Sequence, residues 1–295
     1  MSGARRRDPI MDHDPNDLRD DALAGPFRVW QRKRGHRYSL DDVITGWVAA
    51  RACPAAGSVV DLGCGLGSVL LMLAYKLPRA RLWGVEAQAE SFALLERNCE
   101  RNAVRDRVST LHADLREPAC QERLLCEAAL VGHRGFDLVT GTPPYQPEGH
   151  GSVSPDPQRA HARVELRGGV EAYLAAAAVL LAPDGTVVIC ADARTPERVE
   201  NGAAAAGLAT LTRMDVVPAP RKPALFSVFS LAHAAHAAAR RCERLPAFFA
   251  RDERGARTPE ALAVRSFFDL PLPLAEAPSP QQRARSQRAL RSEAS

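Results

Sequence analysis

Lysine is scarce in this sequence of 295 residues: its 39 lysine and arginine residues include only three lysines, Lys33, Lys76 and Lys222. Alanine is abundant as well, and the two biases together are typical of a coding sequence rich in G and C rather than of one function. The net charge of +4 is only mildly basic, so composition alone does not predict a nucleic-acid-binding protein. The 46% of hydrophobic and 25% of charged residues are ordinary for a globular protein.

Cysteine pairs are missing. The seven cysteines are odd in number and form no Cys-x-x-Cys pair, and no histidine lies at a ligand-like spacing from them. These spacings exclude the common zinc motifs, and we therefore predict no metal site. Scattered single cysteines are typical of proteins of a reducing compartment.

Long apolar runs are missing too. No stretch approaches the roughly 20 apolar residues that a membrane span requires. The N-terminal residues 1–17 contain no apolar segment of the kind that marks a secretory signal. Together with the single cysteines, these absences predict a soluble, cytoplasmic protein with no membrane contact.

Composition divides the chain into one domain between two tails. Residues 1–24 are polar, charged and proline-containing, and residues 277–295 are polar and rich in arginine, so we expect both tails to be disordered. Between them, over residues 25–276, short apolar runs alternate with longer helical stretches, without an internal repeat. This alternation is typical of an α/β protein with a parallel sheet.

The apolar runs predict seven strands, at 58–62, 81–85, 108–112, 136–140, 186–190, 208–217 and 224–232. Helices are expected at 68–77, 88–103 and 170–185, the last ending at a glycine. The last two strands have no helix-length connection, so we expect them to pair antiparallel. The prediction is a Rossmann-like, doubly wound, seven-stranded, mostly parallel sheet with an antiparallel edge strand. In such a sheet, ligands bind at the carboxyl ends of the strands.

A glycine-rich turn follows the first expected strand. It contains Asp61, Gly63, Gly65 and Gly67, and glycines at such a turn let the backbone approach a ligand closely. A dinucleotide site requires the spacing G-x-G-x-x-G, but the third glycine of that pattern would fall on Ser68. The spacing therefore argues against NAD.

Two acidic residues follow the next two expected strands. Glu86 comes at the end of the second strand, where a carboxylate is able to accept hydrogen bonds from both hydroxyls of a ribose. Asp114 follows the third strand, where it is able to accept from the exocyclic amine of an adenine. The alternative is that both are solvated carboxylates at loop ends.

With the glycine turn, these carboxylates make the sequence resemble the class I S-adenosylmethionine-dependent methyltransferases. The resemblance implies the class I methyltransferase fold and S-adenosylmethionine as cofactor. It places Asp61, Gly63, Gly65 and Gly67 beside the methionine part of the cofactor. It also assigns Glu86 to the ribose and Asp114 to the adenine.

Two adjacent prolines end the fourth expected strand, in the segment Thr142-Pro143-Pro144-Tyr145. Proline has no backbone N–H, so a pair of prolines stops a sheet strand and leaves a rigid extended corner. Taken alone, the segment is equally typical of a proline-rich turn.

This corner resembles the [N/D/S]-PP-[Y/F] motif of methyltransferases that modify planar exocyclic amines. The resemblance implies that Thr142, Pro143, Pro144 and Tyr145 are catalytic, with acceptors for the amine N–H groups and an aromatic face for the base. Thr142 departs from the commonest first residue, Asn or Asp, although its hydroxyl is also able to accept. A member that binds the cofactor without catalysis is the alternative.

A basic segment precedes the first expected strand. Its cations are interleaved with Trp30, His36 and Tyr38, a combination that suits phosphates and bases and so predicts contact with nucleic acid. The predicted substrate-binding residues are Arg32, Lys33, Arg34, Arg37 and Tyr38. The alternative is a solvated basic turn.

The opening pattern Q-x-K-x-G-x-R-[FY]-S-x-D is similar to that of the bacterial tRNA1(Val) adenine-N6 methyltransferases. In this sequence it comprises Gln31, Lys33, Gly35, Arg37, Tyr38, Ser39 and Asp41. The resemblance covers roughly residues 26–272 and implies a tRNA substrate, with an adenine near the anticodon flipped into the corner. No obligate protein partner is predicted.

The segment between Tyr145 and Gly169 is long and contains His150, Arg159, His161 and Arg163. It is interpreted either as a mobile loop over the substrate or as a disordered insertion. Three functions remain open: a tRNA adenine methyltransferase, a methyltransferase of a protein glutamine or an rRNA guanine amine, and a non-catalytic RNA-binding scaffold.

Overall fold

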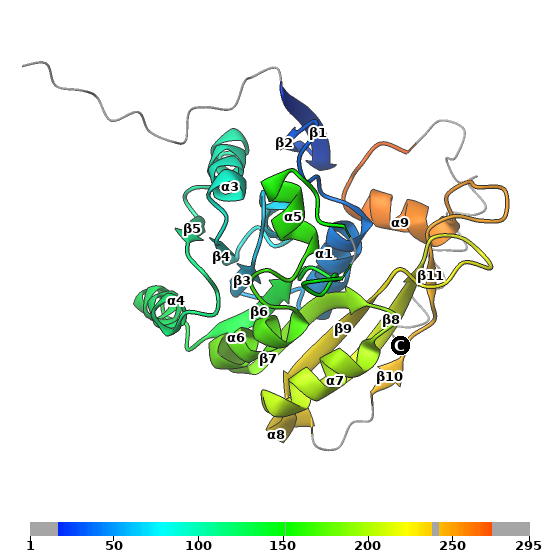
Figure 1. The fold of residues 1–295 in the computed structure, drawn as a ribbon. Helices are drawn as coiled ribbons and strands as arrows, with labels where there is room; N and C mark the ends of the chain where they lie inside the picture. The colour runs from blue at the N-terminus through cyan, green and yellow to red at the C-terminus, as the bar shows by residue number, and fades with distance from the viewer. Residues whose placement is uncertain (1–16, 151, 238–241, 273–295) are drawn as a thin grey trace, which may run out of the picture.

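A central, mainly parallel sheet organises the chain in a computed structural model that describes residues 17–150, 152–237 and 242–272 (Figure 1). The strand order is β10-β8-β9-β7-β6-β3-β4-β5, and β11 also pairs with β8. The strands are β3 (Ser58–Leu62), β4 (Arg81–Glu86), β5 (Val108–His112), β6 (Phe136–Gly141), β7 (Leu181–Asp192), β8 (Leu208–Val217), β9 (Phe226–His233), β10 (Glu243–Arg244) and β11 (Phe248–Phe249). All seven predicted strands are present, and the class I methyltransferase fold is confirmed.

Helices cover both faces of the sheet. They are α1 (Leu40–Ala52), α2 (Ser68–Lys76), α3 (Ala89–Arg101), α4 (Pro118–Leu130), α5 (Pro157–Arg163), α6 (Val170–Leu180), α7 (Pro196–Ala205), α8 (Ala234–Ala237) and α9 (Pro259–Phe267). One hydrophobic core contains side chains of α1, α2, α3 and α9, and a second contains those of α4, α6 and α7. Every residue of β3 is buried between these two layers, including the polar Ser58 and Asp61.

The reversed strand is not at the edge of the sheet, where the sequence placed it. β9 lies between β7 and β8 and is antiparallel to both. The first six residues of β9 are buried, whereas most of β8 is only half-buried. An apolar strand such as β9 buries more apolar surface inside the sheet than at its edge, and this burial favours the inner position. β8 therefore lies further out, with β10 and β11 beside it.

The helix predicted over 170–185 is wrong at its C-terminal end. α6 ends at Leu180, and Leu181 already pairs with Phe136 as the first residue of β7. Pro183 explains the difference, because the residue before a proline is disfavoured in helical conformation. Gly185 therefore lies in a strand and does not cap the helix.

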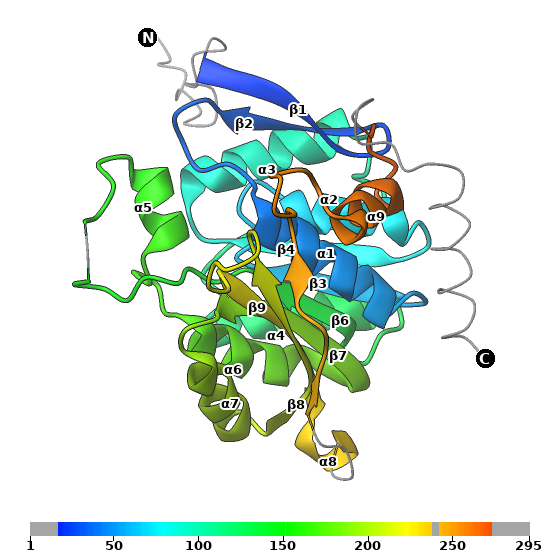
Figure 2. The ribbon, with the colours of Figure 1, turned by 90° about the vertical axis from the view of Figure 1, so that its right-hand side faces the viewer.

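The predicted disordered tail over 1–24 is wrong for residues 17–24. β1 (Leu18–Ala24) pairs with β2 (Phe27–Arg32) as an antiparallel hairpin, and Leu18 and Leu23 are buried. Figure 2 shows this hairpin beside α3, where the buried Asn98 side chain bonds both the N–H and the carbonyl of Trp30. Residues 1–16 and the predicted tail over 277–295 lie outside the described residues.

Candidate active site

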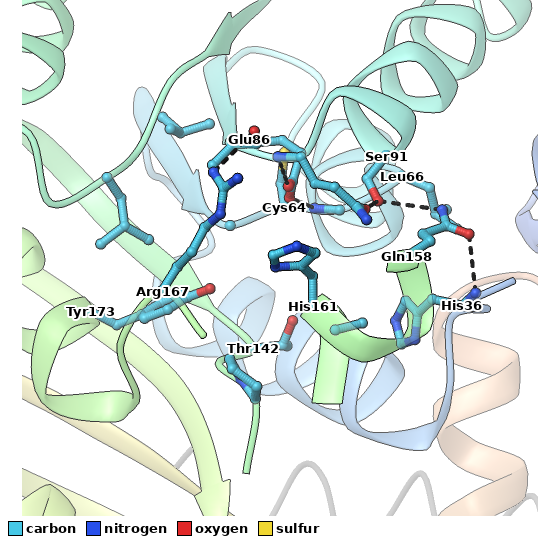
Figure 3. Close-up of a pocket in the computed structure, with 18 of the residues that line it drawn as sticks. His36, Cys64, Leu66, Glu86, Ser91, Thr142, Gln158, His161, Arg167 and Tyr173 are labelled. Atoms are coloured by element: carbon cyan, nitrogen blue, oxygen red, sulfur yellow. Dashed lines mark hydrogen bonds between the residues drawn. The ribbon is translucent and has the colours of Figure 1, made fainter. Parts of the chain in front are cut away.

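The carboxyl ends of β3, β4, β5 and β6 meet beside two neighbouring hollows. We call the first the glycine-loop cavity; its lining includes Gly63, Gly65, Glu86 and Asp114 (Figure 3). We call the second the corner groove; it is lined by Thr142, Pro143, Pro144, Tyr145 and side chains of α5 and of the loop after β7. The parallel strands thus bring together the glycine turn, both predicted carboxylates and the proline corner.

The turn after β3 depends on glycine at two positions that face the cavity. Gly63 has a φ of +59°, and a Cβ there would lie 2.1 Å from the Tyr173 hydroxyl oxygen. Gly65 has a φ of +57°, and a Cβ there would meet no atom within 4 Å. Gly67 also has a positive φ, but it forms the N-cap of α2 and does not line the cavity.

Asp61 lies beneath the glycine turn and does not line the cavity, contrary to the position that the resemblance implied. Its side chain is buried and accepts hydrogen bonds from the Thr140 hydroxyl at 2.8 Å and the Leu70 N–H at 3.1 Å. These bonds connect β6 and the first turn of α2. Asp61 therefore holds the turn in place, and burial raises the pKa of its carboxyl to about 7.

Asp61→Asn is expected to weaken the dependence of stability on pH. Between about pH 4 and pH 7 the folded chain retains the Asp61 proton that the unfolded chain, with a pKa of about 3.9, has released. Stability therefore falls as the pH rises through this window, by up to about 1.4 kcal/mol per pH unit for this group. The amide has no such proton; its oxygen still accepts from the Leu70 N–H, and its NH2 group is able to donate to the Thr140 hydroxyl oxygen. Urea unfolding of both proteins between about pH 5 and pH 7 tests this. Equal slopes of the unfolding free energy against pH for the two proteins would contradict it.

Glu86 lines the glycine-loop cavity and is tied to the backbone around it. Its two carboxylate oxygens accept from the Gly65 N–H at 2.8 Å and the Gln88 N–H at 2.6 Å. Burial raises the pKa of this carboxyl. Because each carboxylate oxygen has a second lone pair, Glu86 is still able to accept from ligand hydroxyls.

Asp114 lines the same cavity at the end of β5. It forms an ion pair of 2.7 Å with Arg116, which holds the pKa of its carboxyl below its usual range. Glu86 and Asp114 therefore both lie where the sequence placed them. These two acceptors suit a cofactor whose ribose hydroxyls and adenine amine donate, and the open space at Gly65 admits a ligand close to the backbone.

The proline corner separates the two hollows. Thr142 and Pro144 line both of them, whereas Pro143 and Tyr145 line the corner groove. The Tyr145 hydroxyl lies 2.9 Å from the Cys190 sulfur, and burial raises the pKa of this phenol. The neighbouring β7 strand therefore anchors the hydroxyl end of Tyr145.

The predicted basic surface reaches the site only in part. Arg37 and the half-buried Tyr38 line the corner groove. Lys33 and Arg34 are exposed and line neither hollow.

Arg32 lies elsewhere and is engaged in ion pairs. Its guanidinium contacts Asp17 at 3.1 Å, Glu90 at 2.7 Å and Asp156 at 3.0 Å. The prediction that Arg32 binds substrate is therefore wrong, because its charge is neutralised within the fold, where it joins the hairpin to α3 and the α5 segment.

The segment between Tyr145 and Gly169 contains an ordered helix, α5, so its interpretation as a disordered insertion is wrong for the described residues. Gln158 is buried; it accepts from the His36 N–H at 3.1 Å and donates to the Ser91 hydroxyl at 3.3 Å. Figure 3 shows His161 in the middle of the glycine-loop cavity, between Glu86 and Thr142. No local sequence signal identified Gln158 as a lining residue, because its partners lie far away in the chain.

Within residues 17–150, 152–237 and 242–272, no group of three or more potential ligand side chains is placed to hold a metal ion. Over the same residues, every helix is too short or too polar to cross a membrane.

Comparison with known proteins agrees with this geometry. Residues 48–126, from α1 through β5 into α4, match the family model described as "Methyltransferase small domain". The fold is similar to the solved structure of a predicted O-methyltransferase from Agrobacterium tumefaciens, with a TM-score of 0.55 and 17% identity over 80% of this chain and 100% of that chain. The chain therefore has the fold of the class I methyltransferases, the class whose methyl donor is S-adenosylmethionine, and part of it matches a methyltransferase family model.

Among curated proteins, the chain resembles two kinds of methyltransferase. It is 29% identical over 167 residues to a protein of Porphyromonas gingivalis named tRNA1(Val) (adenine(37)-N6)-methyltransferase. A Vibrio cholerae protein of the same name is 25% identical over 70% of this chain and 79% of its own length. A release factor glutamine methyltransferase of Geobacter sulfurreducens is 34% identical over 122 residues. The matches span 61% of the Porphyromonas protein and 38% of the Geobacter protein.

Proposed function

We propose that this protein transfers a methyl group from S-adenosylmethionine to an exocyclic amine of a nucleic-acid base, most specifically adenine N6 in a tRNA near the anticodon. The position of the proline corner carries the proposal, because Thr142 and Pro144 line both the glycine-loop cavity and the corner groove. An amine held in the groove then lies beside a cofactor held in the cavity, and this proximity lowers the barrier to transfer.

The corner suits a planar amine, which is a poor nucleophile because its lone pair is delocalised into the ring. The Pro143 carbonyl and the Thr142 hydroxyl supply acceptors for its N–H groups, and these bonds favour a pyramidal nitrogen with a free lone pair. Tyr145 supplies a face for stacking, which contributes about 1–3 kcal/mol per base. When bound, the cofactor supplies the activated methyl group.

Charge in the corner groove supports a nucleic acid over a protein acceptor. Arg194 pairs with Asp192, and Arg198 pairs with glutamates. By contrast, Arg37 and Arg163 are exposed, and neither guanidinium contacts an acidic side chain within the described residues. Two unneutralised cations beside the corner suit the phosphates that flank a target base.

Arg37→Gln and Arg163→Gln are each expected to weaken tRNA binding and to reduce its salt dependence. Loss of one phosphate contact lowers the slope of log affinity against log salt by about one. Arg134→Gln is the matched control, because Arg134 is exposed and precedes β6, away from the carboxyl ends of the strands. Fluorescence anisotropy with labelled tRNA at several salt concentrations measures the slopes; slopes equal to that of Arg134→Gln would contradict the assignment.

A protein glutamine is the second candidate acceptor. The match to the Geobacter glutamine methyltransferase favours it, and a carboxamide nitrogen is also planar and delocalised. The same corner chemistry would serve both acceptors. The choice between a base and a glutamine side chain therefore depends on which substrate the corner groove binds.

Transfer of labelled methyl from S-adenosylmethionine to separated RNA, protein and DNA of a gene-deletion strain tests the proposal. N6-methyladenosine in digested tRNA is the expected product. Label in protein that survives nuclease treatment would move the assignment to glutamine, and label in rRNA guanine would move it to that amine. Tight cofactor binding with no label in any fraction would favour a non-catalytic scaffold.

A further inference from the structure

Six residues line both the glycine-loop cavity and the corner groove, and they therefore surround the place where the two ligands meet. They are His36, Tyr38, Asp42, Thr142, Pro144 and Ala162. The acceptor amine is expected at this junction, beside these residues and the adjoining Pro143 carbonyl.

Two polar members of this set are already engaged within the protein. The Tyr38 hydroxyl donates to the Ala22 carbonyl at 2.8 Å. The Asp42 carboxylate accepts from the Ser68 hydroxyl at 3.0 Å and the Ser39 N–H at 2.8 Å. Both side chains therefore have structural roles beside the site.

His36 differs from them. Its backbone N–H donates to Gln158, but within the described residues neither ring nitrogen has a hydrogen-bond partner. The ring lies on the turn between β2 and α1, and Figure 3 shows it at the rim of the cavity next to α5. Among the described residues, this imidazole thus lines both hollows and keeps a nitrogen available to accept a hydrogen bond.

The surroundings keep this imidazole neutral. Burial lowers the pKa of His36, and Arg163 and Arg159 on α5 lower it further, whereas Asp41 on α1 opposes them. The other titratable groups around the junction are Tyr38, Asp42 and His161, which all line the glycine-loop cavity. A neutral imidazole accepts a proton at pH 7.

We propose that His36 is a catalytic residue that accepts a hydrogen bond from the acceptor amine and then takes its proton. The proposal rests on the methyltransferase function proposed above. The amine nitrogen forms a bond to the methyl carbon while the carbon–sulfur bond breaks, and the electron pair of that bond stays on sulfur. The nitrogen then carries a positive charge and passes one proton to His36, which releases it to water.

This role also accounts for the departure at the first position of the corner. Thr142 offers one hydroxyl, whereas the Asn or Asp of the usual motif offers a stronger carbonyl or carboxylate acceptor. His36 supplies a second acceptor from a different element, and it adds a site for the released proton.

His36→Gln tests the proposal, because glutamine keeps a hydrogen-bond acceptor but takes up no proton. We expect the single-turnover rate of methyl transfer to fall about 100-fold, within the range for general-base catalysis. The wild-type rate should fall as the pH drops below the pKa of His36, and this acid limb should be absent in the variant. The dissociation constant of S-adenosylmethionine should change less than about twofold, which also shows that the site is folded.

His133→Gln is the matched control, because His133 precedes β6 and lines neither hollow. A rate within about twofold of wild type for His36→Gln, with the acid limb retained, would overturn the proposal. The assay uses whichever acceptor the wild-type protein labels. Label in protein would thus reject the tRNA assignment while His36 is still tested on that acceptor, and no wild-type transfer to any fraction would reject both.

Discussion

Gly65→Arg is expected to abolish binding of S-adenosylmethionine, with the dissociation constant raised more than about 100-fold. Gly65 has a positive φ and lines the glycine-loop cavity, and no atom lies within 4 Å of the position that a Cβ would take there. An arginine side chain extends from this position into the space that the cofactor requires. It also strains the hydrogen bond between the Gly65 N–H and Glu86, because a residue with a Cβ disfavours this backbone conformation.

The matched control for this change is Gly132→Arg. Gly132 also has a positive φ, +89°, and open space around its Cβ position, but it lies in the exposed turn before β6. Both variants therefore carry the same kind of backbone strain, and only one fills the cavity. Isothermal titration calorimetry on both proteins separates the two effects; unchanged affinity in Gly65→Arg would remove the cofactor from this cavity.

Tyr145→Ala is expected to lower kcat/KM for methyl transfer by roughly 5- to 150-fold. This range corresponds to the loss of about 1–3 kcal/mol of base stacking. The change should leave cofactor affinity nearly unaltered, because Tyr145 lines the corner groove and not the glycine-loop cavity.

Tyr145→Phe separates the ring from the hydroxyl. Phenylalanine keeps the stacking face and loses two contacts of the hydroxyl: the one at 2.9 Å with the Cys190 sulfur, a weak acceptor, and the one at 3.4 Å with the Asp41 carboxylate. We expect kcat/KM within about fivefold of wild type for this variant. If Tyr145→Phe and Tyr145→Ala lose the same activity, the hydroxyl and not the ring face is what the reaction uses.

Much of the fold follows from local patterns in the chain. The strands at 58–62, 108–112 and 208–217 have the bounds that the sequence predicted. Of these, β3 is buried along its whole length, as a strand covered on both faces must be, whereas β5 and β8 are buried only in part. The side chains that follow successive parallel strands must meet at one edge of the sheet. Chain order alone therefore brought Glu86, Asp114 and the proline corner to one site.

Other features depended on contacts between distant parts of the chain. Arg32 has the same local signature as Arg37, yet carboxylates from the hairpin, α3 and the α5 segment surround it and exclude it from the site. The resemblance placed Asp61 beside the cofactor, whereas in the structure β6 and α2 provide the donors that hold it below the turn.

The sequence by itself thus determined the class of fold, the order of the strands that meet at the site and the chemistry of the glycine turn and the proline corner, because these depend on periodicity and on neighbouring residues. The tertiary structure alone decided which charges are neutralised, that β9 lies inside the sheet and that α5 covers the cavity. It also decided that His36 faces both hollows. Ion pairing and burial depend on which distant segments pack together, and no local pattern in the chain records that.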